Sequence, residues 1–357
     1  MSERCSSRSS SECAVPCERC SNTRSAMSKG RIMDRYVFAV DDEVFCCWEH
    51  DLADRNQRFL SSFDSEYFNY VAQRHLDQLN GENSQRAAVA LRAAYHHGLE
   101  TLFSLLGALA QAPGAVPAWI PKCTNTSLRK LVETIRVGGM VLTQIGPQRV
   151  SLHDLAALAH AFCWPEDQPT GVTGDRFGRA WVHFAQDFLD PHVIAEYNSI
   201  KHGFRFSAGG FILRAGIEEE YGVHAPEASM QTLGASPFGT SFYEDIPILE
   251  GGSSKFHFRI RHRSLNWRAE AMAQRLQLLA WSVNNVVSAL RCINGAAPGT
   301  VRFHRPEDPA AFDAAWGWHV GVHASNFDYV VDPSDIDPLP RDELRRELES
   351  RAGESTS

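Results

Sequence analysis

DPHVIAEYNSIKHGFR, residues 190–205, predicts a short helix whose start, end and buried face can all be recognised. Asp190 suits the N-cap, and Pro191 suits the first helical position, where its missing N–H costs nothing. Gly203 suits the left-handed position that often follows the last turn. Four residues recur at helical spacing and are expected to face the core: Val193, Tyr197, Ile200 and Phe204.

Three polar residues, Asn198, Lys201 and His202, fall on another side of this helix. The last two lie at its C-terminal end, where unpaired carbonyls favour cations. One interpretation is structural: Lys201 and His202 stabilise the helix end, and Asn198 serves the local backbone. The other is functional, because an imidazole and an ammonium group together can move a proton and offset charge on a phosphate.

The chain has 357 residues, the composition of a globular protein and a formal net charge of −8. This charge argues against wholesale wrapping of nucleic acid or an anionic membrane, but it allows a local basic patch. We find no secretory signal and no continuous apolar run that predicts a membrane span. Nine cysteines, with Cys46 and Cys47 adjacent, suit a reducing compartment. We therefore expect a cytoplasmic protein with no membrane partner.

Hydrophobic periodicity and turn residues divide the chain into three parts. Residues 1–32 are expected to be a disordered leader. The alternative is a zinc site, of which Cys17-x-x-Cys20 would supply two of the four ligands. Residues 33–330 are expected to form one domain, and residues 331–357 a flexible charged tail. Helices are predicted at residues 51–80, 83–112, 126–137, 151–163, 175–189 and 267–293. We predict a hairpin at residues 36–48, strands at 211–213 and 255–263, and a long loop excursion near 216–254. The expected fold class is mainly α, a helical bundle with a small antiparallel β element.

A polar stripe runs along the longest predicted helix: Arg92, His96, Glu100 and Ser104. It lines a cavity or faces water. His and acidic residues also occur four apart in His96 with Glu100, His183 with Asp187, and His192 with Glu196, which leaves a metal-dependent helical-bundle enzyme as an alternative. We assign no metal ligands and expect no cofactor, because the chain has no P-loop, no dinucleotide fingerprint and no Gly-x-Ser-x-Gly motif.

Strict alternation at residues 255–263 predicts a strand with a basic face and an apolar face. The basic face holds Lys255, His257, Arg259, Arg261 and Arg263. The apolar residues Phe256, Phe258 and Ile260 are expected to be buried. Arg205 and Arg214 lie in the adjoining β region and would extend the basic surface. Such a surface suits phosphates, although a solvated edge strand also carries charge.

The pattern Asn198-x-x-Lys201-His202-Gly203 at a helix end resembles the signature of the HEPN (higher eukaryotes and prokaryotes nucleotide-binding) superfamily. Active members of that family are small helical bundles that cleave RNA without a metal through Arg-(Asn/Asp/His)-x-x-x-His, usually across a dimer interface. Asn198 and His202 match this pattern, but Tyr197 stands at the position of the arginine. A phenol cannot replace a guanidinium as a phosphate clamp, so Lys201 or Arg205 would have to stand in.

The resemblance implies a HEPN-like protein that binds RNA or nucleotides, with a degenerate metal-independent ribonuclease as its catalytic form. Its candidate catalytic residues are His202, Asn198 and Lys201, and the resemblance also implies a homodimer. The alternative is a noncatalytic protein-interaction module, in which the end of the helix is purely structural.

Overall fold

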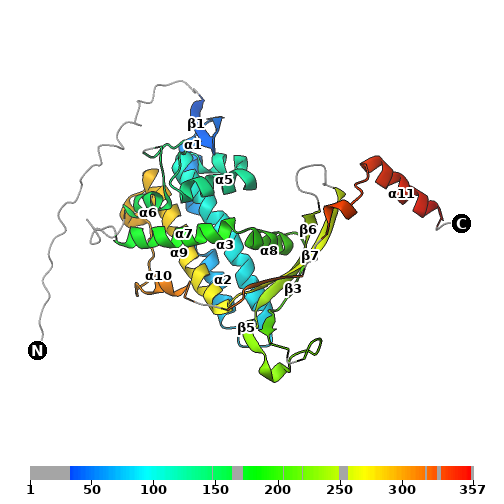
Figure 1. Ribbon diagram of the computed structural model, residues 1–357. Coiled ribbons are helices and arrows are strands. Elements are labelled where there is room, and N and C mark those ends of the chain that lie inside the picture. The colour runs from blue at the N-terminus through cyan, green and yellow to red at the C-terminus, as the bar shows by residue number, and fades with distance from the viewer. Residues whose placement is uncertain are drawn as a thin grey trace, which may run out of the picture.

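The computed structural model describes residues 33–146, 148–162, 172–203, 205–218, 220–248, 256–317, 320–327 and 331–354 (Figure 1). The predicted leader at residues 1–32 lies outside them. Of the described residues, about 53% are helical and 17% are in strands. The prediction of a mainly α bundle is therefore wrong, and the fold is mixed α/β.

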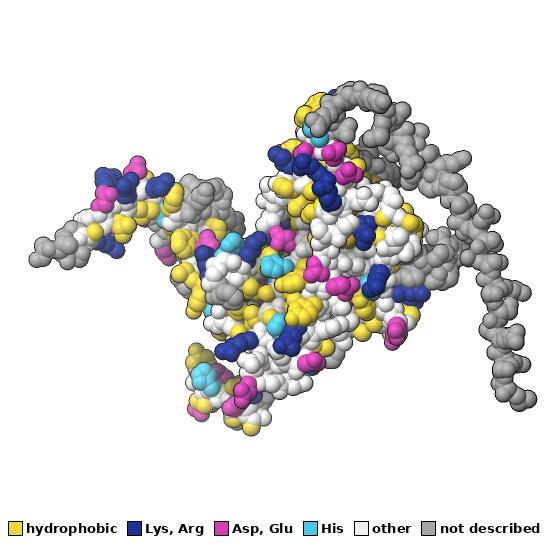
Figure 2. All heavy atoms as spheres, turned by 180° about the vertical axis from the view of Figure 1, so that it is seen from behind, with side chains coloured by type: hydrophobic (Ala, Val, Ile, Leu, Met, Phe, Trp, Pro, Cys, Tyr) yellow, Lys and Arg dark blue, Asp and Glu magenta, His cyan; other side chains and the backbone are white. Residues whose placement is uncertain are grey.

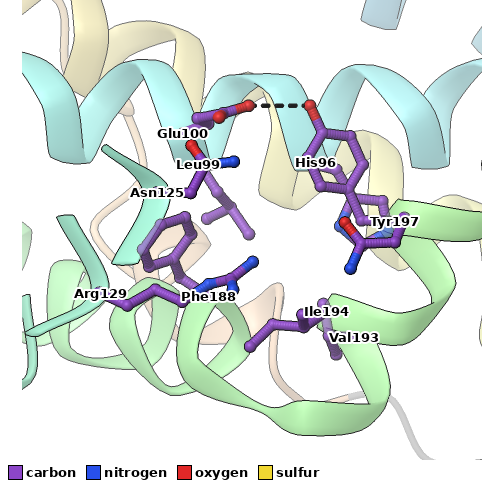
Figure 3. Close-up of a pocket in the computed structure, with 10 residues that line it drawn as sticks. His96, Leu99, Glu100, Asn125, Arg129, Phe188, Val193, Ile194 and Tyr197 are labelled. Carbon is purple, nitrogen blue, oxygen red and sulfur yellow. Dashed lines mark hydrogen bonds between the residues drawn. The ribbon is translucent and has the colours of Figure 1, made fainter. Parts of the chain in front are cut away.

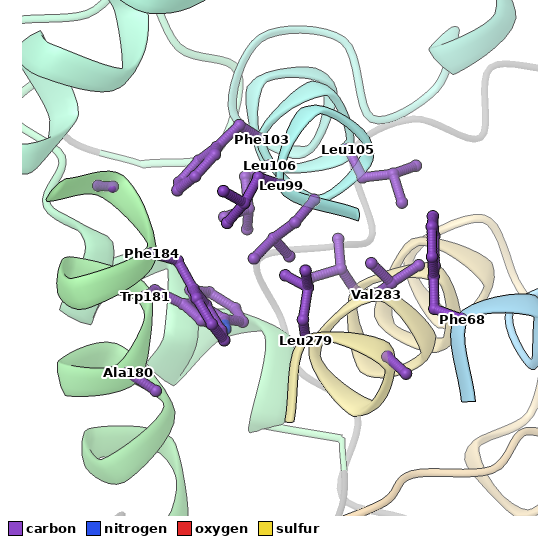
Figure 4. Close-up of a cluster of buried hydrophobic side chains, with 14 of the residues drawn as sticks. Phe68, Leu99, Phe103, Leu105, Leu106, Ala180, Trp181, Phe184, Leu279 and Val283 are labelled. Carbon is purple, nitrogen blue, oxygen red and sulfur yellow. The ribbon is translucent and has the colours of Figure 1, made fainter. Parts of the chain in front are cut away.

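The centre of the helical part is the pair α3 (Ser84–Gln111) and α9 (Ala269–Ile293). Large apolar side chains from these helices meet those of α2 (Tyr67–Leu76) and α7 (Val172–Leu189), as Figure 4 shows. Two glycines of α3 permit this packing. A Cβ on Gly98 would lie 2.5 Å from the Leu279 side chain, and one on Gly107 would lie 2.5 Å from Trp119.

The N-terminal hairpin is confirmed as β1 (Asp34–Val40) and β2 (Glu43–Glu49). The single helix expected at residues 51–80 is instead α1 (Leu52–Ser62) followed by α2. The chain leaves the helix because Phe63 is extended, and the Asp64 carboxylate accepts a hydrogen bond from the Glu66 N–H to form a turn.

Most of the strand residues lie where the sequence predicted a loop or a single strand. A four-stranded antiparallel sheet has the order β3 (Phe206–Ala208), β6 (Gly239–Pro247), β7 (Phe258–Asn266) and β8 (Ala324–Phe327). A second pair is β4 (Ile212–Ala215) with β5 (Gln231–Ala235). The expected loop excursion at residues 216–254 is therefore wrong, since β5 and β6 fall inside it. Both strands are rich in Gly and polar residues, which weakens the hydrophobic signal.

The remaining helices are α4 (Val116–Trp119), α5 (Asn125–Arg136), α6 (Leu152–His160), α8 (Pro191–Lys201), α10 (Ala311–Ala314) and α11 (Arg341–Glu354). Helix α8 contacts α7 and α3 on one side and β3 and β6 on the other. It therefore joins the helical part to the sheet. Helix α11 lies within the segment predicted as a flexible tail, and Figure 1 shows it projecting from the end of the sheet.

Among the described helices, none by itself has the length and apolar character needed to cross a bilayer. One pair, α3 with the short helices at residues 116–122, meets both criteria together but is bent by 113°.

Candidate functional site

Helix α8 begins and ends where the sequence predicts. The Asp190 carboxylate accepts hydrogen bonds from the backbone N–H groups of His192 at 2.7 Å and Val193 at 3.4 Å. Gly203 has a φ of +94°, a conformation that favours glycine. The predicted buried face is only partly correct, because Val193 and Tyr197 are half-buried and Phe204 lies outside the described residues. The most deeply buried side chain of α8 is instead that of Glu196.

Glu196 is the centre of a buried polar cluster that joins α8 to α3 and the sheet. Its carboxylate accepts hydrogen bonds from Arg92 Nε at 2.9 Å, Thr240 Oγ1 at 2.5 Å and Trp267 Nε1 at 3.2 Å. Burial by itself would raise the pKa of Glu196, but the nearby Arg92 and His96 outweigh burial and hold this pKa well below its usual range. Glu196 is therefore ionised and paired with Arg92.

His96 lies beside the same carboxylate, with Nε2 3.3 Å from Glu196 Oε2. Burial and the neighbouring Arg92 lower the pKa of His96, so its imidazole is neutral at pH 7. The cluster thus contains one cation and one anion. It fixes the rotation of α8 about its axis, and so it determines where the next residues, Tyr197 and Asn198, point.

Tyr197 and Asn198 face a narrow cleft between α3, α5, α7 and α8, which we call the α5–α8 cleft (Figure 3). The cleft is lined by His96, Leu99 and Glu100 of α3, by Asn125 and Arg129 of α5, by Phe188 of α7, and by Val193, Ile194, Tyr197 and Asn198 of α8. His96 and Glu100 belong to the predicted polar stripe, so the cavity interpretation of that stripe is confirmed for these two residues.

The polar groups of the cleft differ in how well they are paired. Tyr197 donates a hydrogen bond from its hydroxyl to Glu100 Oε2 at 2.9 Å, and Lys201 Nζ lies 3.9 Å from Glu100 Oε1. Arg129 contrasts with them, because its Nε is buried and has no hydrogen-bond partner among the described residues. Figure 3 shows the Arg129 side chain directed into the cleft. A guanidinium in this position is available to an anionic ligand.

Tyr197 occupies the place of the missing arginine but cannot act as one. Burial is the main cause that raises the pKa of Tyr197, and the hydrogen bond to Glu100 raises it further. The phenol therefore stays neutral. The ring also stacks on His96, with the ring centroids 5.0 Å apart. Tyr197 is therefore a structural part of the cleft wall.

The structure separates the three candidate catalytic residues. Asn198 lines the cleft, and Lys201 adjoins it through Glu100. His202 is exposed at the C-cap of α8, where its backbone N–H donates to the carbonyl of Asn198 at 3.0 Å. Its imidazole is accessible to solvent but is not part of the cleft lining.

The expected orientation of the basic strand is wrong. On β7 the apolar residues Phe258 and Ile260 are exposed, whereas Arg259 and Arg261 are half-buried and Arg263 is only 4% exposed. Arg263 donates to Glu244 at 2.8 Å through Nε and lies 2.5 Å from His192 Nδ1 through Nη1. These partners neutralise and solvate the arginine inside the protein, which allows the charged face to turn inward.

The remaining basic candidates do not form a continuous surface with this strand. Arg205 is exposed, and Arg214 is exposed but paired with Glu227. His257 Nε2 accepts a hydrogen bond from the backbone N–H of Leu339 at 3.1 Å. Lys255 lies outside the described residues. A basic ribbon for phosphates on β7 is therefore not supported, since Arg263 is enclosed.

Within the described segments, no group of three or more His, Cys, Asp or Glu residues is arranged to hold a metal ion. One of the His–acid pairs proposed from the sequence, His192 with Glu196, has separate partners, because His192 contacts Arg263 while Glu196 binds Arg92.

Arg129 was not singled out from the sequence. It follows Leu128 at the edge of the buried face of α5, so amphipathicity could have marked it as a border residue. Glu196 was singled out only together with His192 as a possible metal pair, and its role in the buried cluster was missed because its partners Arg92 and Thr240 are far away in the sequence.

Comparisons of the chain with protein-family models, curated proteins and solved structures find no match.

Proposed function

We propose that this protein binds a phosphate-bearing ligand, an RNA or a nucleotide, in the α5–α8 cleft, and that it acts in the cytoplasm. The observation that carries the proposal is Arg129, a guanidinium that faces the cleft with a buried and unpartnered Nε. Arginine suits this task because its planar fork matches phosphate oxygens and is always charged. Arg129 would supply the cation that position 197 lacks.

The other groups of the cleft fit the same ligand. The side-chain amides of Asn125 and Asn198 can donate hydrogen bonds to phosphate or sugar oxygens. Glu100 would repel a phosphate, but Lys201 lies beside it and offsets its charge. The Glu100 carboxylate can instead accept a hydrogen bond from a ribose hydroxyl.

A larger hollow adjoins the cleft and gives room for the rest of a nucleotide. It has a volume of about 650 Å³ and shares Glu100 and Asn125 with the cleft. Its wall includes Phe63 and Tyr67, whose rings could stack on a base.

The experiment is a titration of fluorescein-labelled single-stranded RNA, and separately of a labelled adenosine nucleotide, followed by fluorescence anisotropy. Arg129→Met should weaken binding about 10- to 100-fold, the range expected when a hydrogen bond to a charged group is lost. Arg136→Met is the matched control, because Arg136 lies on the same helix and is half-buried like Arg129, but is paired with Glu133. Equal affinities of the two variants would remove Arg129 from the site.

We further propose that the protein cleaves the RNA that it binds, and this activity would depend on His202. Its exposed imidazole could accept the proton of the attacking 2′-hydroxyl or donate one to the leaving 5′-oxygen. His202→Ala should then abolish RNA cleavage in the presence of EDTA while leaving the affinity for RNA nearly unchanged. Cleavage at the wild-type rate would exclude His202 from the mechanism.

A second candidate function is a noncatalytic interaction protein. The four-stranded sheet favours it, because apolar side chains of β6, β7 and β8 face outward: Tyr243, Phe258, Ile260 and Phe327.

A further inference from the structure

The outward side of the four-stranded sheet carries large apolar side chains, although it is exposed to solvent. Strand register places Tyr243 opposite His262, His262 opposite Phe327, and Asp245 opposite Ile260. Residues directly opposite in antiparallel strands share a face. With Phe258, two positions before Ile260, these side chains form what we call the outer face.

The large side chains of the outer face are exposed. The exposed fractions are 68% for Tyr243, 52% for Phe258, 64% for Ile260 and 71% for Phe327. Their neighbours on the other side of the same strands are buried: Phe242, Arg263 and Leu265. Among the described residues, these positions of the sheet are thus covered on one side only, and Figure 2 shows hydrophobic side chains in the region next to the projecting helix α11.

The exposed area is large enough to drive association. Aromatic and large aliphatic side chains present roughly 150–250 Å² each, so these four leave on the order of 500 Å² of apolar surface in water. This is at the upper end for the largest patch of a typical monomer. Two such faces packed together would bury about 1,000 Å², the lower limit for a specific interface.

The charges of the outer face identify the partner. It carries no Lys or Arg among its described positions, which argues against nucleic acid as its ligand. Its polar groups are the acidic Asp245 and the imidazole of His262. Asp245 on β6 lies opposite Ile260 of β7, two residues before His262. A second copy related by a two-fold axis presents the same pair in the opposite order. Asp245 of one copy can therefore meet His262 of the other without repulsion between like charges.

We infer that the protein forms a symmetric dimer in which the outer faces of two copies pack against each other. The aromatic row from Tyr243 through His262 to Phe327, with ring centroids 5.0 and 6.2 Å apart, forms the centre of each half. This inference does not depend on the α5–α8 cleft, which lies on the other side of α8 from the sheet.

The test is the molar mass of the full chain by sedimentation equilibrium at about 100 µM, above the micromolar Kd expected of an interface of this size. The wild type should be a dimer. Ile260→Asp and, independently, Phe327→Lys should be monomers with unchanged circular dichroism. Val44→Asp should remain a dimer, because Val44 is equally exposed on the distant β2 strand.

Two outcomes would overturn the inference: a monomeric wild type, and a dimer that survives both outer-face variants. If the wild type is monomeric and its binding of labelled single-stranded RNA is lost in Ile260→Asp, the outer face is instead a stacking platform for bases. A change of RNA affinity in Arg129→Met without a change of molar mass would leave this inference intact.

Discussion

Glu196 and Arg92 show how a single buried residue organises the region around the cleft. Both are enclosed, and the carboxylate accepts hydrogen bonds from α3, from β6 and from Trp267, which directly follows β7. A buried ion pair adds little net stability by itself, but removal of one partner leaves an uncompensated charge. The pair therefore acts mainly to hold α8 in one orientation.

Glu196→Ala should lower the free energy of unfolding by about 3–5 kcal/mol, because Arg92 would remain buried without its partner. The measurement is urea denaturation followed by circular dichroism. Glu133→Ala is the control, since Glu133 pairs with Arg136 on the surface and its loss should cost about 1 kcal/mol or less. Similar losses in the two variants would show that Glu196 is not enclosed as described.

His160 gives a second prediction at this scale, on pH. It is stacked on Phe177 and lies 2.7 Å from the carbonyl of Ala156, and burial lowers its pKa to about 4. In the unfolded chain its pKa is about 6.5. Between these values the unfolded state binds more protons, so stability is complete above about pH 6.5 and falls as the pH drops toward 4.

The contribution of His160 to this loss is about 3 kcal/mol. His160→Gln should therefore flatten the dependence of the unfolding free energy on pH between 6.5 and 4, even if the variant is less stable at pH 7. The measurement is urea denaturation at a series of pH values. An unchanged slope would assign the acid sensitivity to other groups.

At the scale of elements, the helices and the N-terminal hairpin were largely predictable from the sequence, and the four-stranded sheet was not. Residues 190–203 carry an N-cap, a proline at the first position and a glycine past the end, and α8 has those bounds. The sheet lacked such local signals. On β7 the alternation was correct, but its direction was inverted, because the sequence could not show that Glu244 and His192 would receive Arg263.

The inverted strand can be tested by comparing its two faces. Arg263→Ala should destabilise the protein by about 2–4 kcal/mol, since it leaves Glu244 without its closest cation in a partly enclosed site. Ile260→Ser should change stability by about 0.5 kcal/mol or less when measured at low concentration, where association does not contribute. A larger loss of stability in Ile260→Ser than in Arg263→Ala would instead support the orientation expected from the sequence, with Ile260 buried and Arg263 exposed.

At the scale of the whole molecule, the site depends on contacts between distant parts of the chain. The cleft combines α3, α5, α7 and α8. Arg129, whose buried Nε has no hydrogen-bond partner among the described residues, belongs to α5, a helix that carries no part of the HEPN-like motif. Asn198 could be proposed from its spacing to His202. Arg129 could not, because the packing of α5 against α3 and α7 brings it to α8.

The net charge of −8 also sets a condition on the proposed function. A protein of this charge repels RNA at long range, so binding must come from a few local cations. The affinity should then depend on salt much less steeply than for a protein that contacts many phosphates.

The most direct test of the α5–α8 cleft is the dependence of RNA affinity on salt, measured for the wild type, Arg129→Met and Arg136→Met. If Arg129 contacts a phosphate, its replacement should reduce the slope of log K against log salt concentration by about 0.7 to 1, while Arg136→Met keeps the wild-type slope. A wild-type slope in Arg129→Met, or no measurable RNA binding by the wild type, would contradict the account.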